Sequence, residues 1–196
     1  MTVKQQPMIC NQVLIALGGN VTGQKDSPFE EITDAITQIS LSELIVVKQS
    51  RAYRTPCFPA GADPDFVNAA LLCKSTQSPA AILQILHQIE ARAGRERKKR
   101  WGPRVIDLDL LAMGDLILPD RTSYLRWAGL PLAAQMQDAP DDLILPHPRL
   151  HERAFVLAPL MDIAPEWCHP VLNMTVAEMF AALDPALLAD IHPISP

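Results

Sequence analysis

The chain has 196 residues, is 48% apolar and carries a formal net charge of −5 at pH 7. This length and apolar content predict a single domain over residues 1–196 and exclude an intrinsically disordered chain. The negative balance argues against a nucleic-acid binder, and no apolar run reaches the ~20 residues of a membrane span, so a soluble cytoplasmic protein is expected.

In chain order, strand-like and helix-like patterns alternate through the first half of the sequence. The expected elements are a strand at 12–17, a helix at 29–39, a strand at 44–53, a loop at 55–64, a strand at 65–74, a helix from 79 to a stop at 94, and a strand at 105–113. Asp26 or Ser27 before Pro28 opens the first helix, and Ser78 before Pro79 opens the second.

The second half is less regular. Residues 116–118 are expected to form a hairpin with the preceding strand across Gly114 and Asp115. Residues 119–142 mix loop signals with apolar residues and are interpreted as an insertion, with a short helix near 132–136. The remaining expected elements are an extended segment at 143–148 and helices at 152–161 and 175–183.

The order strand, helix, strand, strand, helix, strand is the βαββαβ pattern of a ferredoxin-like fold. We therefore predict the α+β class, with an antiparallel sheet, helices packed on it, an insertion at about 119–142 and additional C-terminal helices. Four cysteines without a C-x-x-C pair indicate reduced thiols rather than a zinc site or a disulfide framework.

Asp107 and Asp109 interrupt the otherwise apolar run at 105–113. Alternate residues of a strand face the same side, so the two carboxylates project together, about 7 Å apart along the strand. Asp is a poor strand former, and two such charges repel each other unless a cation lies between them. Carboxylate oxygens bind hard cations, so the pair predicts a metal site rather than the solvent face of an amphipathic strand.

A dense group of cations precedes this strand and consists of Arg95, Arg97, Lys98, Lys99, Arg100 and Arg104. A solvated charged loop is the usual reading of such a run. Guanidinium groups, however, pair with phosphate oxygens in forked hydrogen bonds. The arginines of this run also lie next to two acids in the sequence. The arrangement favours a metal-bound polyphosphate, with Arg104 nearest the acids. Trp101 in this loop is either a core anchor or a residue that closes over the ligand.

Other positions stay open on chemistry alone. Two prolines fix the backbone of His147, which is either an aimed ring or an ordinary surface imidazole. Asn68, inside an apolar strand, makes either a structural bond or a ligand contact, because an unpaired amide is costly to bury. Phe66 and Phe155 are by default core residues.

Taken together, these residues resemble one family, the 6-hydroxymethyl-7,8-dihydropterin pyrophosphokinases of folate biosynthesis, from residue 14 to about 170. The segments that carry the resemblance are Ala-Leu-Gly-Gly-Asn (16–20), Tyr-Arg-Thr-Pro (53–56), Pro-Asp-Phe-Val-Asn-Ala-Ala (64–70), Gly-Arg-Glu-Arg (94–97), Arg-Trp-Gly-Pro-Arg-Val-Ile-Asp-Leu-Asp (100–109), Leu-Pro-His-Pro-Arg-Leu (145–150) and Arg-Ala-Phe-Val-Leu-Ala-Pro-Leu (153–160). The segment at 100–109 is highly specific. The chain departs from the family's usual Ser at Gly19 and from the frequent Tyr at Phe66 and Pro148.

The resemblance implies that Mg-ATP gives its β,γ-pyrophosphoryl group to the pterin hydroxymethyl oxygen and releases AMP. It implies magnesium, two ions in all, on Asp107 and Asp109. The implied catalytic residues are Arg95, Arg104, Asp107 and Asp109, and the implied ATP contacts are Arg95, Lys98, Arg104, His147 and Arg153. The implied pterin pocket consists of Thr55, Pro56, Phe58, Phe66, Asn68 and Phe155. The pterin ring would stack between Phe66 and Phe155.

The expected partners are therefore ATP and 6-hydroxymethyl-7,8-dihydropterin, bound by a monomer that uses neither nucleic acid nor a membrane. One rival is an RNA-binding ferredoxin-like module, but that function needs aromatic residues across the sheet, and the chain has 2 tyrosines. A second rival is a catalytically silent relative that binds a partner through 119–142. Measurable turnover would exclude it.

Overall fold

The structure is a computed structural model that describes residues 10–57, 64–94, 104–131, 134 and 140–194. Its elements in chain order are β1 (Asn11–Gly19), α1 (Pro28–Ser40), β2 (Ile45–Gln49), β3 (Tyr53–Thr55), β4 (Phe66–Ser75), α2 (Pro79–Arg92), β5 (Asp107–Met113), α3 (Arg121–Ala128), η1 (Leu150–Glu152), α5 (Ala154–Ile163), α6 (Val176–Ala181), η2 (Pro185–Leu187) and β6 (His192–Pro193).

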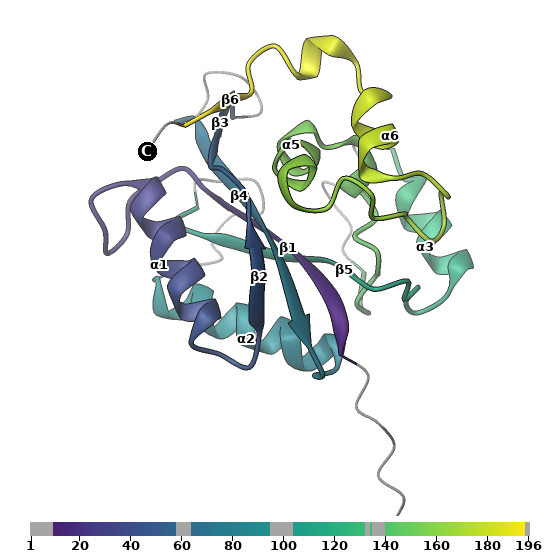
Figure 1. Cartoon of the computed structure of the whole chain (residues 1–196), viewed down its shortest axis with the longest axis horizontal. Helices are drawn as coiled ribbons and strands as arrows, with labels where there is room; N and C mark the ends of the chain where they lie inside the picture. The colour runs from purple at the N-terminus through teal and green to yellow at the C-terminus, as the bar shows by residue number, and fades with distance from the viewer. Residues whose placement is uncertain (1–9, 58–63, 95–103, 132–133, 135–139, 195–196) are drawn as a thin grey trace, which may run out of the picture.

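The strands form one antiparallel sheet in the order β5-β1-β4-β3-β6, and β2 pairs with β4 beside β3. Helices α1 and α2 cover one face of this sheet, and α5 covers the other (Figure 1). This confirms the α+β class and the ferredoxin-like βαββαβ core. If β2 and β3 are counted together as the second strand of that pattern, β1 and β4 are its first and third strands, and they lie side by side at the centre of the sheet.

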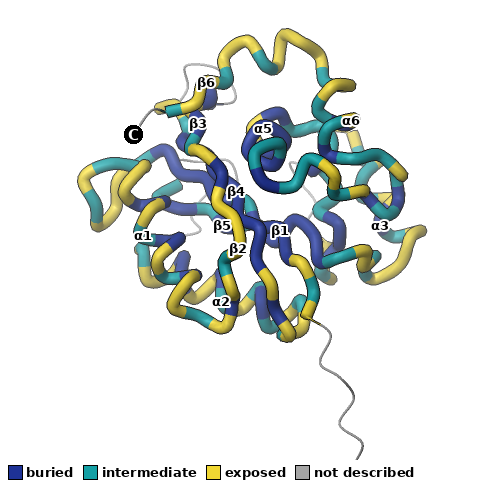
Figure 2. The backbone as a smooth tube through the Cα atoms, in the orientation of Figure 1, coloured by how far each residue is buried: buried dark blue, intermediate teal, exposed yellow. Residues whose placement is uncertain are grey.

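Two apolar cores fill the spaces between the layers, and Figure 2 shows the central strands as buried. Side chains of β1, β4 and β5 that include Ile15, Leu71 and Leu108 pack against α1 and α2. The alternate residues of the same strands, such as Leu14 and Leu72, pack against α5 and α6. Strand alternation therefore decides which side chains can reach a site on the α5 face.

Local capping accounts for the starts of α1 and α2, as the sequence predicts. The hydroxyl of Ser27 accepts a hydrogen bond from the backbone of Glu30, and Ser78 accepts one from Ala81. Gly94 follows α2 with a φ of 85°, a left-handed conformation that suits glycine after a helix. No helix within the described ranges is long and apolar enough to cross a membrane.

Two expectations were wrong, and one helix was missed. The strand expected at 44–53 is two strands, broken at Ser50, whose hydroxyl accepts a bond from the backbone N–H of Ala70 (2.8 Å). Residues 116–118 form no hairpin with β5, because Leu118 pairs instead with Leu145 as an antiparallel bridge. Helix α3 was not expected. The short helix predicted near 132–136 lies mostly outside the described residues.

Candidate active site

One row of residues crosses four strands of the sheet. Asp107 on β5 pairs with Gly18 on β1, Gly18 pairs with Asn68 on β4, and Asn68 pairs with Tyr53 on β3. Neighbouring strands lie about 4.8 Å apart, so Asp107 and Asn68 are separated by roughly 10 Å with Gly18 between them. The row places the predicted metal residue and the predicted pterin residue on one surface.

All of these side chains face α5. Leu108 and Leu110 belong to the core beneath α1 and α2, so Asp107 and Asp109 must project from the opposite face. Likewise Ala70 belongs to the core beneath α5, and the alternation along β4 puts Asn68 on that same face. The acids are half-buried, which fits groups that both pack in the fold and meet a ligand.

Gly18 leaves the middle of the row open. A Cβ atom added there would lie 2.7 Å from the side-chain oxygen of Asn68 and 4.0 Å from the ring of Phe66. Any larger residue would therefore displace the amide. The group that approaches this glycine most closely is the Asn68 amide.

The residues predicted to hold the pterin form a connected group. Asn68 is 6% exposed and its amide nitrogen donates a hydrogen bond to the Thr55 hydroxyl over 2.8 Å. Phe66 pairs with Thr55 across β3 and β4 and is half-buried, while Pro56 is exposed. The structural bond that the sequence allowed for Asn68 is thus present, and it fixes the direction of the amide.

The charged residues predicted to bind phosphate and metal also lie close together. Arg104 forms an ion pair with Asp107, and the two side chains are 26% and 20% exposed. Burial lowers the pKa of the Arg153 guanidinium from its usual value, while the nearby carboxylates of Asp109 and Asp107 oppose that shift. Two acids and two guanidiniums from β5 and from the start of α5 therefore share one region.

His147 lies close to the same charges. Its backbone N–H donates to the Leu111 carbonyl over 2.7 Å, which ties the segment to β5. Burial lowers the pKa of its imidazole to about 3, Arg153 adds to the shift, and Asp107 opposes it. Because its Nδ1 accepts a bond from the Arg149 backbone (3.1 Å), the neutral ring carries its hydrogen on Nε2 and can donate from there.

Phe155 is not a core residue, contrary to its default interpretation. It is 41% exposed, and the Arg153 guanidinium carbon lies 5.6 Å from the centre of its ring. An exposed aromatic face at the start of α5, on the side of the sheet that carries Phe66, is available to a flat ligand. Arg95, Lys98, Phe58 and Trp101 lie outside the described residues.

Two groups were missed by sequence reasoning. Tyr53 continues the row to α5, since its hydroxyl donates to the Asp162 carboxylate (3.0 Å), which also accepts from the Arg51 guanidinium. Asn20, after β1, is 3% exposed and bridges two loops. Asn20 belongs to the segment 16–20 that carries the resemblance, but no role was assigned to it.

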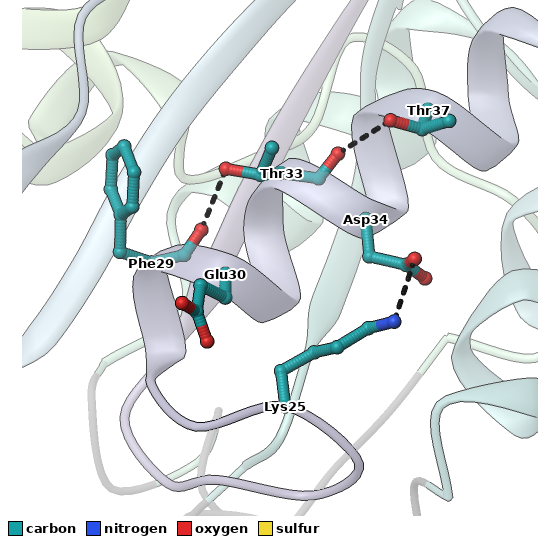
Figure 3. A pocket seen from close by; sticks show the side chains of 6 residues that line it. All are labelled: Lys25, Phe29, Glu30, Thr33, Asp34 and Thr37. Atoms are coloured by element: carbon teal, nitrogen blue, oxygen red, sulfur yellow. Dashed lines mark hydrogen bonds and ion pairs between the residues drawn. The ribbon is translucent and has the colours of Figure 1, made fainter.

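A shallow groove along α1 is a separate feature, lined by Lys25, Phe29, Glu30, Thr33, Asp34 and Thr37 (Figure 3). Lys25 and Asp34 form an ion pair there (3.0 Å). The hydroxyls of Thr33 and Thr37 donate to backbone carbonyls of their own helix. None of the predicted site residues lines it, and we assign it no function.

Comparison with known proteins supports the family resemblance seen in the sequence. Residues 14–165 match the family model of 7,8-dihydro-6-hydroxymethylpterin-pyrophosphokinase. The chain is 32% identical over 179 residues to 2-amino-4-hydroxy-6-hydroxymethyldihydropteridine pyrophosphokinase of Synechocystis, covering 91% of this chain and 79% of the relative. It is 39% identical over 141 residues to the enzyme of the same name from Methylorubrum extorquens, covering 72% and 75%.

A solved structure shares the fold. The wild-type HPPK-DHPS of Plasmodium falciparum superposes with a TM-score of 0.62 at 16% identity, covering 88% of this chain. This chain spans 44% of that longer protein. Together with the family match, these findings show that the chain belongs to the 7,8-dihydro-6-hydroxymethylpterin-pyrophosphokinase family, whose members are ATP-using enzymes of folate synthesis.

Proposed function

We propose that the row from Asp107 to Asn68 is the surface on which this chain brings Mg-ATP and 6-hydroxymethyl-7,8-dihydropterin together. The pterin hydroxymethyl oxygen forms a bond to the β-phosphorus of ATP, and the bond from that phosphorus to the α,β-bridging oxygen breaks. AMP leaves with the bridging oxygen, and the hydroxyl proton is released. The observation that carries the proposal is the register that aligns Asp107, Gly18 and Asn68.

Asp107 and Asp109 fit two magnesium ions by the chemistry of their donors. Both offer carboxylate oxygens from one face of a paired strand, and magnesium prefers oxygen ligands. Within the described ranges, no three His, Cys, Asp or Glu side chains gather as a metal site, so phosphate oxygens and water would complete the coordination. Magnesium bound there would neutralise phosphate charge and polarise the reacting phosphorus.

The cationic residues orient and neutralise the polyphosphate. Arg104 and Arg153 flank the acids, where their fixed fork of donors can hold phosphate oxygens while charge develops. Arg95 and Lys98, which precede Arg104 in the sequence, are proposed to join them. His147 donates from Nε2 to the nucleotide in its neutral form, so it needs no proton from solvent.

The pterin is proposed to lie flat between Phe66 and Phe155. Aromatic faces stack on a flat ring, and the amide of Asn68 supplies both donor and acceptor for the ring's polar edge. Because Thr55 takes one amide hydrogen, it sets which hydrogens face the ligand. Pro56 and Phe58 complete this side of the pocket, and holding both substrates in this geometry is the main catalytic contribution.

We further propose that residues 1–196 act as one domain and as a cytoplasmic monomer, without nucleic-acid or membrane partners. The insertion at 119–142 is proposed to extend the nucleotide side, because Arg149, two residues after His147, donates to the Leu130 carbonyl (3.4 Å). Light scattering on the purified chain would test the monomer.

The test is AMP formation from ATP, with and without the pterin and magnesium, in wild type, Asp107→Ala and Asp109→Ala. Asp115→Ala is a matched control, because this exposed carboxylate lies just after the same strand. We expect wild type to form AMP only when pterin and metal are both present. Both site variants should lose nearly all of this activity, and the Asp115→Ala control should keep it. A folded wild type without turnover would contradict the proposal and favour a catalytically silent, partner-binding relative.

A further inference from the structure

Asn20 joins the two halves of the proposed site through the two ends of one side chain. Its amide oxygen accepts a hydrogen bond from the backbone N–H of Arg104 over 2.8 Å. Its amide nitrogen donates to the carbonyl of Pro64 over 3.1 Å. Arg104 leads into β5 with the acids, and Pro64 leads into β4 with Phe66 and Asn68.

The contact with Arg104 is unusually complete. Besides the side-chain bond, the Arg104 carbonyl accepts from the backbone N–H groups of Asn20 (2.9 Å) and Val21 (3.3 Å). Both backbone groups of Arg104 are therefore bonded to residues 20 and 21. The turn after β1 therefore fixes the backbone position from which the Arg104 side chain reaches Asp107.

Gly19 makes this approach possible. A Cβ atom there would lie 2.4 Å from the carbonyl oxygen of Val105, which is main chain and cannot swing aside as a side chain does. The turn after β1 thus packs directly against the backbone that leads into β5. Asn20 is 3% exposed in this position, so each amide group that lost its partner would be left without water.

The residue type at this position follows from its two partners. A backbone N–H needs an acceptor and a carbonyl needs a donor, so the amide has one orientation that satisfies both. Asp would keep the acceptor for Arg104 but could not donate to Pro64. Leu has a similar shape and would do neither.

We propose that Asn20 is a positioning residue that holds the Arg104 side and the β4 side of the site in one register. The inference rests on the proposed function, because it assigns phosphate to the first side and pterin to the second. Asn20 touches neither substrate. Its effect is on the rate of the transfer step, which requires both substrates to meet at the correct distance.

The experiment compares wild type, Asn20→Leu and Asn20→Asp in single-turnover AMP formation, which reports the transfer step without product release. Calorimetry gives the affinities for the pterin alone and for a non-hydrolysable ATP analogue with magnesium. Gln24→Ala is the matched control, because Gln24 makes an amide-to-carbonyl bond from the same loop, to Arg92 (2.8 Å). Circular dichroism at the assay temperature verifies folding.

For Asn20→Leu we expect a roughly 10- to 100-fold slower transfer step, as for residues that orient a ligand-binding group, with each separate affinity changed less than about threefold. Asn20→Asp should fall between wild type and Leu, and Gln24→Ala should match wild type.

Two results would overturn the inference: a folded Asn20→Leu that transfers at the wild-type rate, or separate affinities that fall as far as the rate. An inactive wild type would instead contradict the proposed function, so the two failures are distinguishable.

Discussion

His169 provides a prediction about stability whose sign can be worked from its contacts. The side chain is fully buried, and its Nδ1 lies 3.2 Å from the backbone N–H of Val171 and 3.3 Å from that of Leu172. Nδ1 must therefore accept, which places the ring hydrogen on Nε2, 3.0 Å from the Tyr124 hydroxyl of α3. A second proton on Nδ1 would break both backbone bonds.

The protonation balance gives the direction. Burial lowers the pKa of His169 to about 4, and the half-buried His151 nearby adds to the shift. The unfolded chain, with a pKa near 6.5, therefore binds more protons than the fold between about pH 6.5 and pH 4. Stability from this group is complete above that window and is lost as the pH falls through it.

The size follows from the same two values. With an unfolded pKa of about 6.5 and a folded pKa of about 4, lowering the pH from about 7.5 to about 5 removes about 2 kcal/mol from the free energy of unfolding. The other rings in contact are those of Tyr124 and Trp167, and neither changes charge in this window.

Urea unfolding of wild type and His169→Asn at both pH values is the measurement. Asn can still accept from the backbone near 171 but does not titrate. We expect the variant to be less stable at about pH 7.5 and the gap to shrink by about 2 kcal/mol at about pH 5. His192→Asn is the control, because His192 is exposed. An unchanged gap between the two pH values would refute the reasoning.

Three further changes test the row across the sheet. Gly18→Ala should push the Asn68 amide aside and weaken pterin binding in calorimetry while sparing the ATP analogue; equal weakening of both ligands would contradict the role of Gly18. Thr55→Val removes the acceptor for the buried Asn68 amide, so it should lower the free energy of unfolding in urea by about 1–3 kcal/mol and also weaken pterin binding; unchanged stability would mean that the bond contributes nothing. Tyr53→Phe removes one bond to Asp162 and should cost about 1 kcal/mol in the same assay, and a larger loss of pterin affinity than of stability would mean that Tyr53 also contacts the ligand.

Features that depend on neighbouring residues could be predicted from the sequence. The common face of Asp107 and Asp109 follows from the period of a strand, whatever the rest of the fold does. The starts of α1 and α2 follow from Ser27 and Ser78, whose hydroxyls bond within their own helices. The same local patterns indicated most of the strands and helices of the core, and hence the order of the fold.

Features that depend on distant partners could not be predicted. Residues 116–118 have the composition of a hairpin strand, and only the position of Leu145 decides that Leu118 pairs elsewhere. Helix α3 buries a single residue, Tyr124, and the partner that buries it is His169, 45 residues later. The exposure of Phe155 and the bridging by Asn20 are likewise set by what lies opposite.

The ion pair between Arg104 and Asp107 balances the charges of the proposed site before a charged substrate binds. Two neighbouring carboxylates repel, and a guanidinium beside them offsets that repulsion within the protein. In the proposed complex each member exchanges partners: the carboxylate takes a metal ion and the guanidinium takes a phosphate oxygen. Both side chains are partly exposed, so separating a pair of this kind costs about 0–1 kcal/mol. The exchange therefore uses little binding energy, and Arg104 already lies where the phosphate is proposed to bind, with its backbone held by Asn20.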